Sequence, residues 1–262
     1  MNKIEKQMVE LLKDLRDNHG VVELKAEFES EAARLNEVMR LKEIIERVGL
    51  GLIIKIGGSE AITDMFHAQQ LGVSGLIAPM IESAYSLSKY LQAIKTYFKS
   101  DLRKEIHFGV NIETYLASEN LPEMLKLKGI RLIDTITVGR VDLVGSMGLG
   151  RTDVNNEKVY KVTEGVFLKA KKKGFRTTMG GGIAIEAIPF ITKLVNKKLL
   201  DRFETRKIVF KAKEGLAKAE EAIVKANKFE LLWLENKKKY YGGIFREDEL
   251  RIKMLKKRIS SK

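Results

Sequence analysis

In this 262-residue chain, the residues best suited to catalysis or metal binding are acids at the ends of short apolar segments. They are Glu29, Glu82, Glu113 and Asp142, with Glu27 two positions before Glu29. Carboxylates that converge on one site repel one another unless a proton, a substrate cation or a divalent metal lies among them. A hard ion such as Mg²⁺ or Mn²⁺ suits such oxygen ligands, whereas the alternative is that each acid stabilises the start of the following helix. We predict metal binding at Glu113 and Asp142.

Two cations fall in the same layer as these acids, Lys55 and Arg140. Lys55 stands among Ile53, Ile54 and Ile56, where an unpaired cation is costly to bury, so its presence predicts a chemical role. Arg140 lies in the segment 138–148, whose small residues allow main-chain N–H groups to face a carboxylate or phosphate. The glycine-rich segment 179–182 is compatible either with ligand contact or with a tight turn.

The elements that must position these groups alternate between short apolar strands and amphipathic helices. The strand candidates are Val21–Phe28, Leu52–Ile56, Gly75–Met80, Ile106–Ile112, Thr135–Val138, Arg176–Gly180 and Lys207–Phe210. They recur at intervals of roughly 30 residues, the length of one βαβ unit. We predict an α/β fold, a parallel β/α (TIM-type) barrel with seven readable strands, over residues 1–211 with an initial helix over 1–19; a doubly wound open sheet is the alternative.

Residues 212–262 form a predicted basic helical extension. From Thr192 onward the chain carries 21 Lys and Arg against 10 Asp and Glu, which is +11 of the total net charge of +13. The pattern predicts one helix over Ala212–Lys239, a break at Gly242–Gly243 and a second helix over Glu247–Ile259. The apolar cluster Leu231–Leu234 predicts a homo-oligomer contact, whereas a tail of this charge could instead bind a polyanion.

The composition excludes several classes of protein. The absence of cysteine rules out disulfide scaffolds, thiol nucleophiles and cysteine-ligated metals, and three scattered histidines disfavour an imidazole metal site. No apolar run is long enough to span a membrane, and no signal peptide precedes the first helix, so we expect a cytoplasmic protein with no membrane contact.

Several segments, taken in order, resemble the HpcH/HpaI aldolase and citrate lyase β-subunit family. They are Leu76–Glu82, Val110–Thr114, Glu119–Leu121, Gly139–Leu143 and Ser146–Gly148. The likeness extends roughly from Val21 to Phe210. It implies a metal-dependent β/α barrel that makes or breaks a C–C bond next to an oxo acid or an acyl thioester.

The resemblance also implies roles for individual residues. Glu113 and Asp142 would be the protein ligands of Mg²⁺ or Mn²⁺, and the main-chain N–H groups of Val141 and Asp142 would hold the substrate carboxylate. Lys55 stands where the family usually has an arginine that steadies the enolate oxygen. The segment 27–30, Glu-Phe-Glu-Ser, stands where aldolase members carry Asp-x-Glu-His, so the family's histidine is absent.

The sequence therefore predicts a metal-dependent C–C lyase or aldolase acting on a small 2-oxo acid such as pyruvate or oxaloacetate, in either direction. Lys55 would stabilise the enolate, Glu27 or Glu29 would move the proton, and Glu82 and Arg140 would contact the second substrate. One alternative is a non-catalytic barrel that binds a partner or an anionic polymer through its basic tail. Another is a phosphosugar isomerase-type barrel with a phosphate site at Gly180–Gly182 and Arg206.

Overall fold

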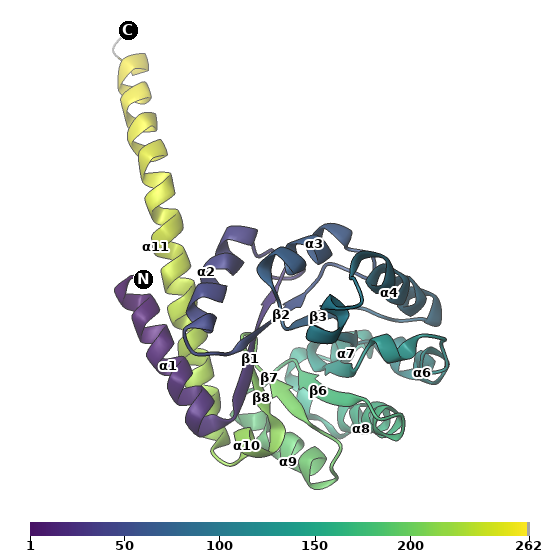
Figure 1. Cartoon of the computed structure of the whole chain (residues 1–262). Coiled ribbons are helices and arrows are strands. Elements are labelled where there is room, and N and C mark those ends of the chain that lie inside the picture. Colours follow the sequence, from purple (N-terminus) through teal and green to yellow (C-terminus); the bar gives the residue numbers. More distant parts are fainter. Residues whose placement is uncertain (261–262) are drawn as a thin grey trace.

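The computed structural model describes residues 1–260, in which eight strands close into one barrel in chain order (Figure 1). The strands are β1 (Val21–Glu27), β2 (Gly51–Lys55), β3 (Gly75–Ala78), β4 (His107–Ile112), β5 (Thr135–Gly139), β6 (Arg176–Gly180), β7 (Arg202–Glu204) and β8 (Ile208–Lys211). Strands β1 to β7 run parallel to one another. The predicted β/α barrel is confirmed.

The last two strands depart from the predicted pattern. Strand β7, which the sequence pattern missed, has only three residues, and two of them are charged. A turn at residues 205–207 leads directly into β8, which runs antiparallel to both β7 and β1. This hairpin leaves no room for a crossover helix, and it places residues 205–207 at the carboxyl-terminal rim of the parallel strands.

Helices cover the outside of the barrel (Figure 1). They are α1 (Lys3–His19), α2 (Leu35–Glu46), α3 (Ile62–Leu71), α4 (Ala84–Tyr97), α5 (Leu102–Glu105), α6 (Tyr115–Met124), α7 (Arg140–Ser146), α8 (Glu157–Lys172), α9 (Ile188–Asn196), α10 (Ala212–Leu216) and α11 (Ala219–Ser260). Polar side chains begin several of them: Ser83, Thr114 and Asn156 each accept a hydrogen bond from a main-chain N–H of the first turn. These caps define where α4, α6 and α8 begin.

The main hydrophobic core lies between the barrel and its helices, and a separate small apolar layer fills the lumen. Ile53, Ile77 and Val209 form that inner layer. Below it, Glu23 contacts His107 at 2.8 Å and Arg202 at 2.5 Å. The inner layer therefore separates a buried ionic cluster at the amino-terminal end of the lumen from the polar groups at the carboxyl-terminal end.

The C-terminal extension is one helix rather than two. Helix α11 continues through Gly242–Gly243 to Ser260, so the predicted break there is wrong. Its first half packs beside α1, with Phe229 and Trp233 buried in the barrel's core, while its second half projects beyond the barrel (Figure 1). The hydrophobic core thus continues past residue 212, the predicted boundary, into the first half of α11. Residues 261–262 of the predicted extension lie outside the described residues. Over the described residues, no helix combines the length and hydrophobicity needed to cross a membrane.

Candidate active site

A cavity of about 430 Å³ opens among the carboxyl-terminal ends of the strands. Charged side chains line it from β1, β2 and β7, from the residue after β4 and from the β7–β8 turn, together with the glycine-rich ends of β5 and β6. The predicted site residues along its walls are Glu27, Lys55, Glu113, Val141 and Asp142. The structure therefore gathers residues from four strand ends into one polar chamber, as a β/α barrel requires of its active site.

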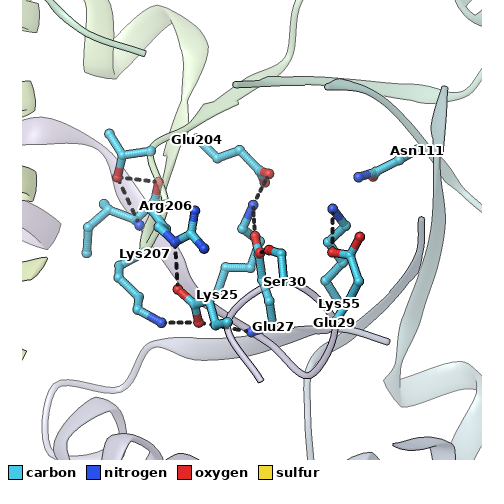
Figure 2. A network of polar contacts seen from close by, with 12 residues as sticks. Lys25, Glu27, Glu29, Ser30, Lys55, Asn111, Glu204, Arg206 and Lys207 are labelled. Carbon is cyan, nitrogen blue, oxygen red and sulfur yellow. Dashed lines mark hydrogen bonds and ion pairs between the residues drawn. The ribbon is translucent and has the colours of Figure 1, made fainter. Parts of the chain in front are cut away.

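Lys25 forms the centre of an ionic network on one wall of this cavity (Figure 2). Its ammonium lies 2.5 Å from Glu204 Oε1 and 3.1 Å from Glu27 Oε1. Burial opposes the charged forms, but the attraction of the two carboxylates outweighs it and raises the pKa of Lys25. For Glu27, burial is likewise outweighed by Lys25 and by a hydrogen bond from Ser30, which lowers its pKa to about 2. Lys25 and Glu27 are therefore ionised at neutral pH.

Lys55 joins two further carboxylates in the same cavity. Its Nζ lies 2.9 Å from Glu29 Oε2 and 3.8 Å from Glu113 Oε2. Burial lowers the pKa of Lys55, but Glu113 and Glu29 outweigh that effect and raise it. The side chain is therefore a cation at neutral pH. Its partners come from neighbouring loops and strands rather than from its own apolar segment.

Glu113 is held rigidly directly after β4. Its Oε1 accepts a hydrogen bond from the Met80 main-chain N–H at 2.9 Å, and its Oε2 accepts one from Asn111 Nδ2 at 3.0 Å. Met80 makes this contact from a left-handed conformation (φ 50°), which is uncommon for a residue with a side chain. Burial raises the pKa of Glu113 even though Lys55 and these hydrogen bonds oppose the rise. The site thus holds a carboxylate that a neighbouring positive charge would stabilise.

The donor set around Glu113 fits a hard divalent cation. Asp142, in the first turn of α7, is exposed to the cavity. Its negative charge helps to raise the pKa of the buried Glu113. The Oδ1 atom of Asn111 is buried with no hydrogen-bond partner. Among the described residues no group of three or more His, Cys, Asp or Glu could hold a metal. Two carboxylates match Mg²⁺, which typically takes one or two and leaves other positions for substrate oxygens and water.

Arg140 does not face the cavity. Its guanidinium is fully buried and donates hydrogen bonds to the carbonyl oxygens of Gly181 (2.8 Å) and Gly182 (3.0 Å) and to Asn155 Oδ1 (2.7 Å). Burial lowers its pKa to about 10, so it stays charged at neutral pH. The predicted contact with a second substrate is replaced by a structural role, in which Arg140 fixes the turn after β6.

Two other predicted residues also lie apart from the cavity walls. Glu82 accepts a hydrogen bond from Thr114 Oγ1 at 2.7 Å, which ties the loop after β3 to the start of α6. Glu29 stands beyond the end of β1 and reaches the site only through its contact with Lys55. Because β1 ends at Glu27, only Glu27 of these two acids belongs to the strand.

Sequence reasoning missed several groups that shape the cavity. Lys25 and Glu204 form an ion pair of 2.5 Å on its wall, and behind the turn before β8 Lys207 pairs with Glu31 at 2.5 Å. Arg206, named above only for a phosphate site, also lines the cavity and pairs with Glu31 at 3.1 Å. A signal for Lys25 was present: residues 23, 25 and 27 are all charged and alternate along β1, so they share one face. Glu204 offered none, since its strand is too short and polar to recognise.

A family model describing the HpcH/HpaI aldolase/citrate lyase family matches residues 50–180, which is half of the chain. The protein belongs to the HpcH/HpaI aldolase/citrate lyase family. The match ends at Gly180, so it includes both proposed metal ligands and Lys55 but not Lys25 or Glu204. Membership supports a lyase or aldolase activity for this chain.

Solved structures show the same fold as this HpcH/HpaI family member. An HpcH/HpaI aldolase from Desulfitobacterium hafniense DCB-2 is 15% identical with a TM-score of 0.57, over 74% of this chain and 89% of that one. The citrate synthase SbnG is 14% identical with a TM-score of 0.62, over 78% and 82% of the two chains. A citrate lyase from Burkholderia xenovorans LB400 is 11% identical with a TM-score of 0.56, over 81% and 73%. The comparison with curated proteins found no match.

Proposed function

We propose that this HpcH/HpaI family protein is a divalent-metal-dependent C–C lyase or aldolase, or the corresponding condensing enzyme, for a small 2-oxo acid such as pyruvate or oxaloacetate. The observation that carries the proposal is the meeting of Glu113, Asp142 and the Lys55 ammonium at one cavity. Cleavage and condensation pass through the same enolate, so the site serves either direction.

Glu113 and Asp142 would hold Mg²⁺ or Mn²⁺ in this site. When bound, such an ion supplies an electrophile that withdraws electron density from the carboxylate and 2-oxo group of the substrate. Glu113 suits this role because the Met80 and Asn111 hydrogen bonds fix its carboxylate before any ligand arrives. Asp142 suits it because its carboxylate is exposed to the cavity.

Lys55 would stabilise the negative charge that develops on the 2-oxo oxygen. Its raised pKa keeps it protonated at neutral pH, and its contacts with Glu29 and Glu113 hold it in place. A fixed cation in a partly buried site stabilises the negative charge on the enolate oxygen more strongly than the uncharged 2-oxo group of the substrate. Lysine supplies one point charge here, without the paired N–H groups of an arginine.

Glu29 is the better of the two predicted bases. Glu27 is tied to Lys25 and Ser30, and its pKa of about 2 makes it a weak proton acceptor at neutral pH. Glu29 has a side chain that is 27% exposed, and its partner is Lys55, the group proposed to contact the reacting oxygen. Proton transfer through Glu29, directly or through water, would replace the family histidine. None of the chain's three histidines lines the cavity.

The start of α7 would hold the substrate carboxylate through the N–H groups of Val141 and Asp142. First-turn N–H groups of a helix lack partners within that helix. Gly181 lies against this turn, and a Cβ at that position would come within 2.7 Å of the Arg140 and Val141 nitrogens. The glycine therefore keeps side-chain atoms away from the Val141 N–H group.

Titration calorimetry with Mn²⁺ tests the metal site directly. Loss of a residue that only hydrogen-bonds a metal ligand typically weakens metal binding by about 10–100-fold. Glu113→Gln removes a ligand itself, so it should weaken Mn²⁺ binding by at least as much. Glu60→Gln is the matched control, because it removes a carboxylate on the surface that pairs only with Lys89 in the described structure. Equal affinity in the wild type and Glu113→Gln would refute the site. It would favour the alternative of a non-catalytic binding barrel. The absence of the family's histidine, and the ion pairs of Lys25 with Glu27 and Glu204, also fit that alternative.

A further inference from the structure

Helix α11 carries a line of exposed apolar side chains that nothing in the described structure covers. Val224, Leu231, Phe245, Ile252 and Ile259 recur at multiples of seven residues, and Leu234 and Leu255 fall between them. Each of these seven side chains is between 40% and 75% exposed. The face of the helix that contacts the barrel is a different one, formed by residues such as Ile223, Phe229 and Trp233.

This spacing is that of a coiled-coil seam. Val224, Leu231, Phe245, Ile252 and Ile259 occupy position a of successive heptads, while Leu234 and Leu255 occupy position d. From Val224 to Ile259 the line extends about 53 Å at 1.5 Å per residue. It begins where α11 still packs on the barrel and continues along the part that projects from it (Figure 1). A second helix could therefore pack along most of this line.

Two charged residues interrupt the seam, and their signs define the arrangement. Lys238 occupies position a and Asp248 position d, both exposed, and neither forms an ion pair within the described residues. In a parallel dimer, position a faces position a and d faces d, so lysine would meet lysine and aspartate would meet aspartate. In an antiparallel dimer, position a faces position d, so each lysine can meet an aspartate.

The register that pairs these charges also pairs the apolar residues. With Lys238 beside the partner's Asp248, Leu234 lies beside the partner's Ile252 and Leu231 beside the partner's Leu255. Shifting the helices by one heptad in either direction places Asp248 against an apolar residue, Leu231 or Phe245. One alignment therefore pairs both charges, gives Leu231, Leu234, Ile252 and Leu255 apolar partners, and places Phe245 beside the partner's Tyr241.

We propose that α11 forms an antiparallel two-stranded coiled coil with α11 of a second copy of this chain, with Lys238 paired to the partner's Asp248. This gives the predicted homo-oligomer contact a defined geometry, and it is independent of the proposed catalytic function. A closed two-fold dimer follows, since an antiparallel pair of identical helices is symmetric. A basic amphipathic helix lying on a membrane would need no heptad period and no acidic residue on its apolar face.

Charge reversal tests the pairing by sedimentation across a concentration series. Lys238→Asp and Asp248→Lys should each weaken dimerisation at least about tenfold, because each places like charges opposite one another. The double variant should restore it. Lys239→Asp, one residue away and off the seam, is the control and should dimerise as the wild type does. A monomeric wild type, or a double variant no better than either single variant, would overturn the proposal.

Cysteine cross-linking gives an independent test in a chain that has no cysteine of its own. Under mild oxidation, Lys238→Cys protein mixed with Asp248→Cys protein should yield a covalent dimer, whereas either variant alone should not. Each variant linking to itself would indicate parallel helices and refute the geometry. Monomeric protein that sediments with anionic phosphatidylserine vesicles, and loses this binding in Phe245→Asp, would also refute it. In both cases the wild-type Mn²⁺ affinity would report separately on the catalytic proposal.

Discussion

Gly139→Ala should disturb the site through one added methyl group. Gly139 ends β5 beside Glu113, and a Cβ at this position would lie 2.5 Å from Glu113 Oε2. The backbone itself accepts alanine, because Gly139 has an extended conformation with φ −92° and ψ 99°. The whole effect of the substitution should therefore come from the contact with the carboxylate.

The size of the effect follows from how firmly Glu113 is held. Ordinary contact begins near 3.4 Å, so the carboxylate must retreat by about 1 Å. Such a shift breaks or stretches its hydrogen bonds to Met80 and Asn111, which are 2.9 and 3.0 Å long. Loss of one hydrogen bond to a charged buried group costs about 1.5–3 kcal/mol. For a chain of this size, at about 2–4 °C per kcal/mol, we expect the melting temperature to fall by about 3–12 °C.

Gly145→Ala provides the matched control, since it lies in α7 with no heavy atom within 4 Å of the added Cβ. It should leave Mn²⁺ affinity unchanged and stabilise the helix by up to about 1 kcal/mol. Scanning calorimetry and Mn²⁺ titration on both variants check the reasoning. If Gly139→Ala matched the wild type in melting temperature and Mn²⁺ affinity, Glu113 would not be the fixed ligand described above.

Three further substitutions test separate parts of the account. Lys55→Met should lower the free energy of unfolding by about 3–5 kcal/mol, measured in urea, because it leaves the buried Glu113 without its cation. An unchanged free energy of unfolding would show that this ion pair is not formed. Arg140→Lys should destabilise by more than about 2 kcal/mol, since one ammonium cannot replace the donors that hold the Gly181 turn, while Mn²⁺ affinity would change less than in Glu113→Gln. Glu23 has its pKa lowered to about 2 because His107 and Arg202 outweigh its burial, so its stabilisation is complete above about pH 4.5 and is lost as the pH falls toward 2. The difference in unfolding free energy between wild type and Glu23→Gln should shrink by about 3 kcal/mol over that range, and a constant difference would contradict the assignment.

The barrel could be predicted because each βα unit repeats a local pattern. Apolar strands followed by amphipathic helices at about 30-residue intervals define the parallel part of the sheet without any long-range information. Strand β7 could not be recognised, since its segment Arg-Phe-Glu is too short and polar for a strand pattern. The antiparallel direction of β8 depends on the length of the preceding turn, which periodicity does not report. The Gly242–Gly243 pair weakens a helix by about 1 kcal/mol per residue, which α11 tolerates.

The candidate site could be predicted where function follows from strand ends, and not where it depends on contacts between distant segments. Glu113 and Asp142 follow β4 and β5, so the barrel topology alone brings them to one rim. The pairing of Lys25 with Glu204 joins residues that are 179 positions apart. Arg140 shows the opposite error: its position at a strand end suggested a ligand contact, but its side chain turns into the protein to satisfy main-chain carbonyls.

Glu113, as we propose, belongs to a metal site that forms the enolate of a 2-oxo acid. Proton NMR in deuterated water measures this directly, as loss of the pyruvate methyl signal. With Mg²⁺ present, the wild type should exchange the methyl protons, and both metal chelation and Glu113→Gln should abolish the exchange. Exchange that persisted in Glu113→Gln, or a wild type that caused none at saturating Mg²⁺ and pyruvate, would contradict the account.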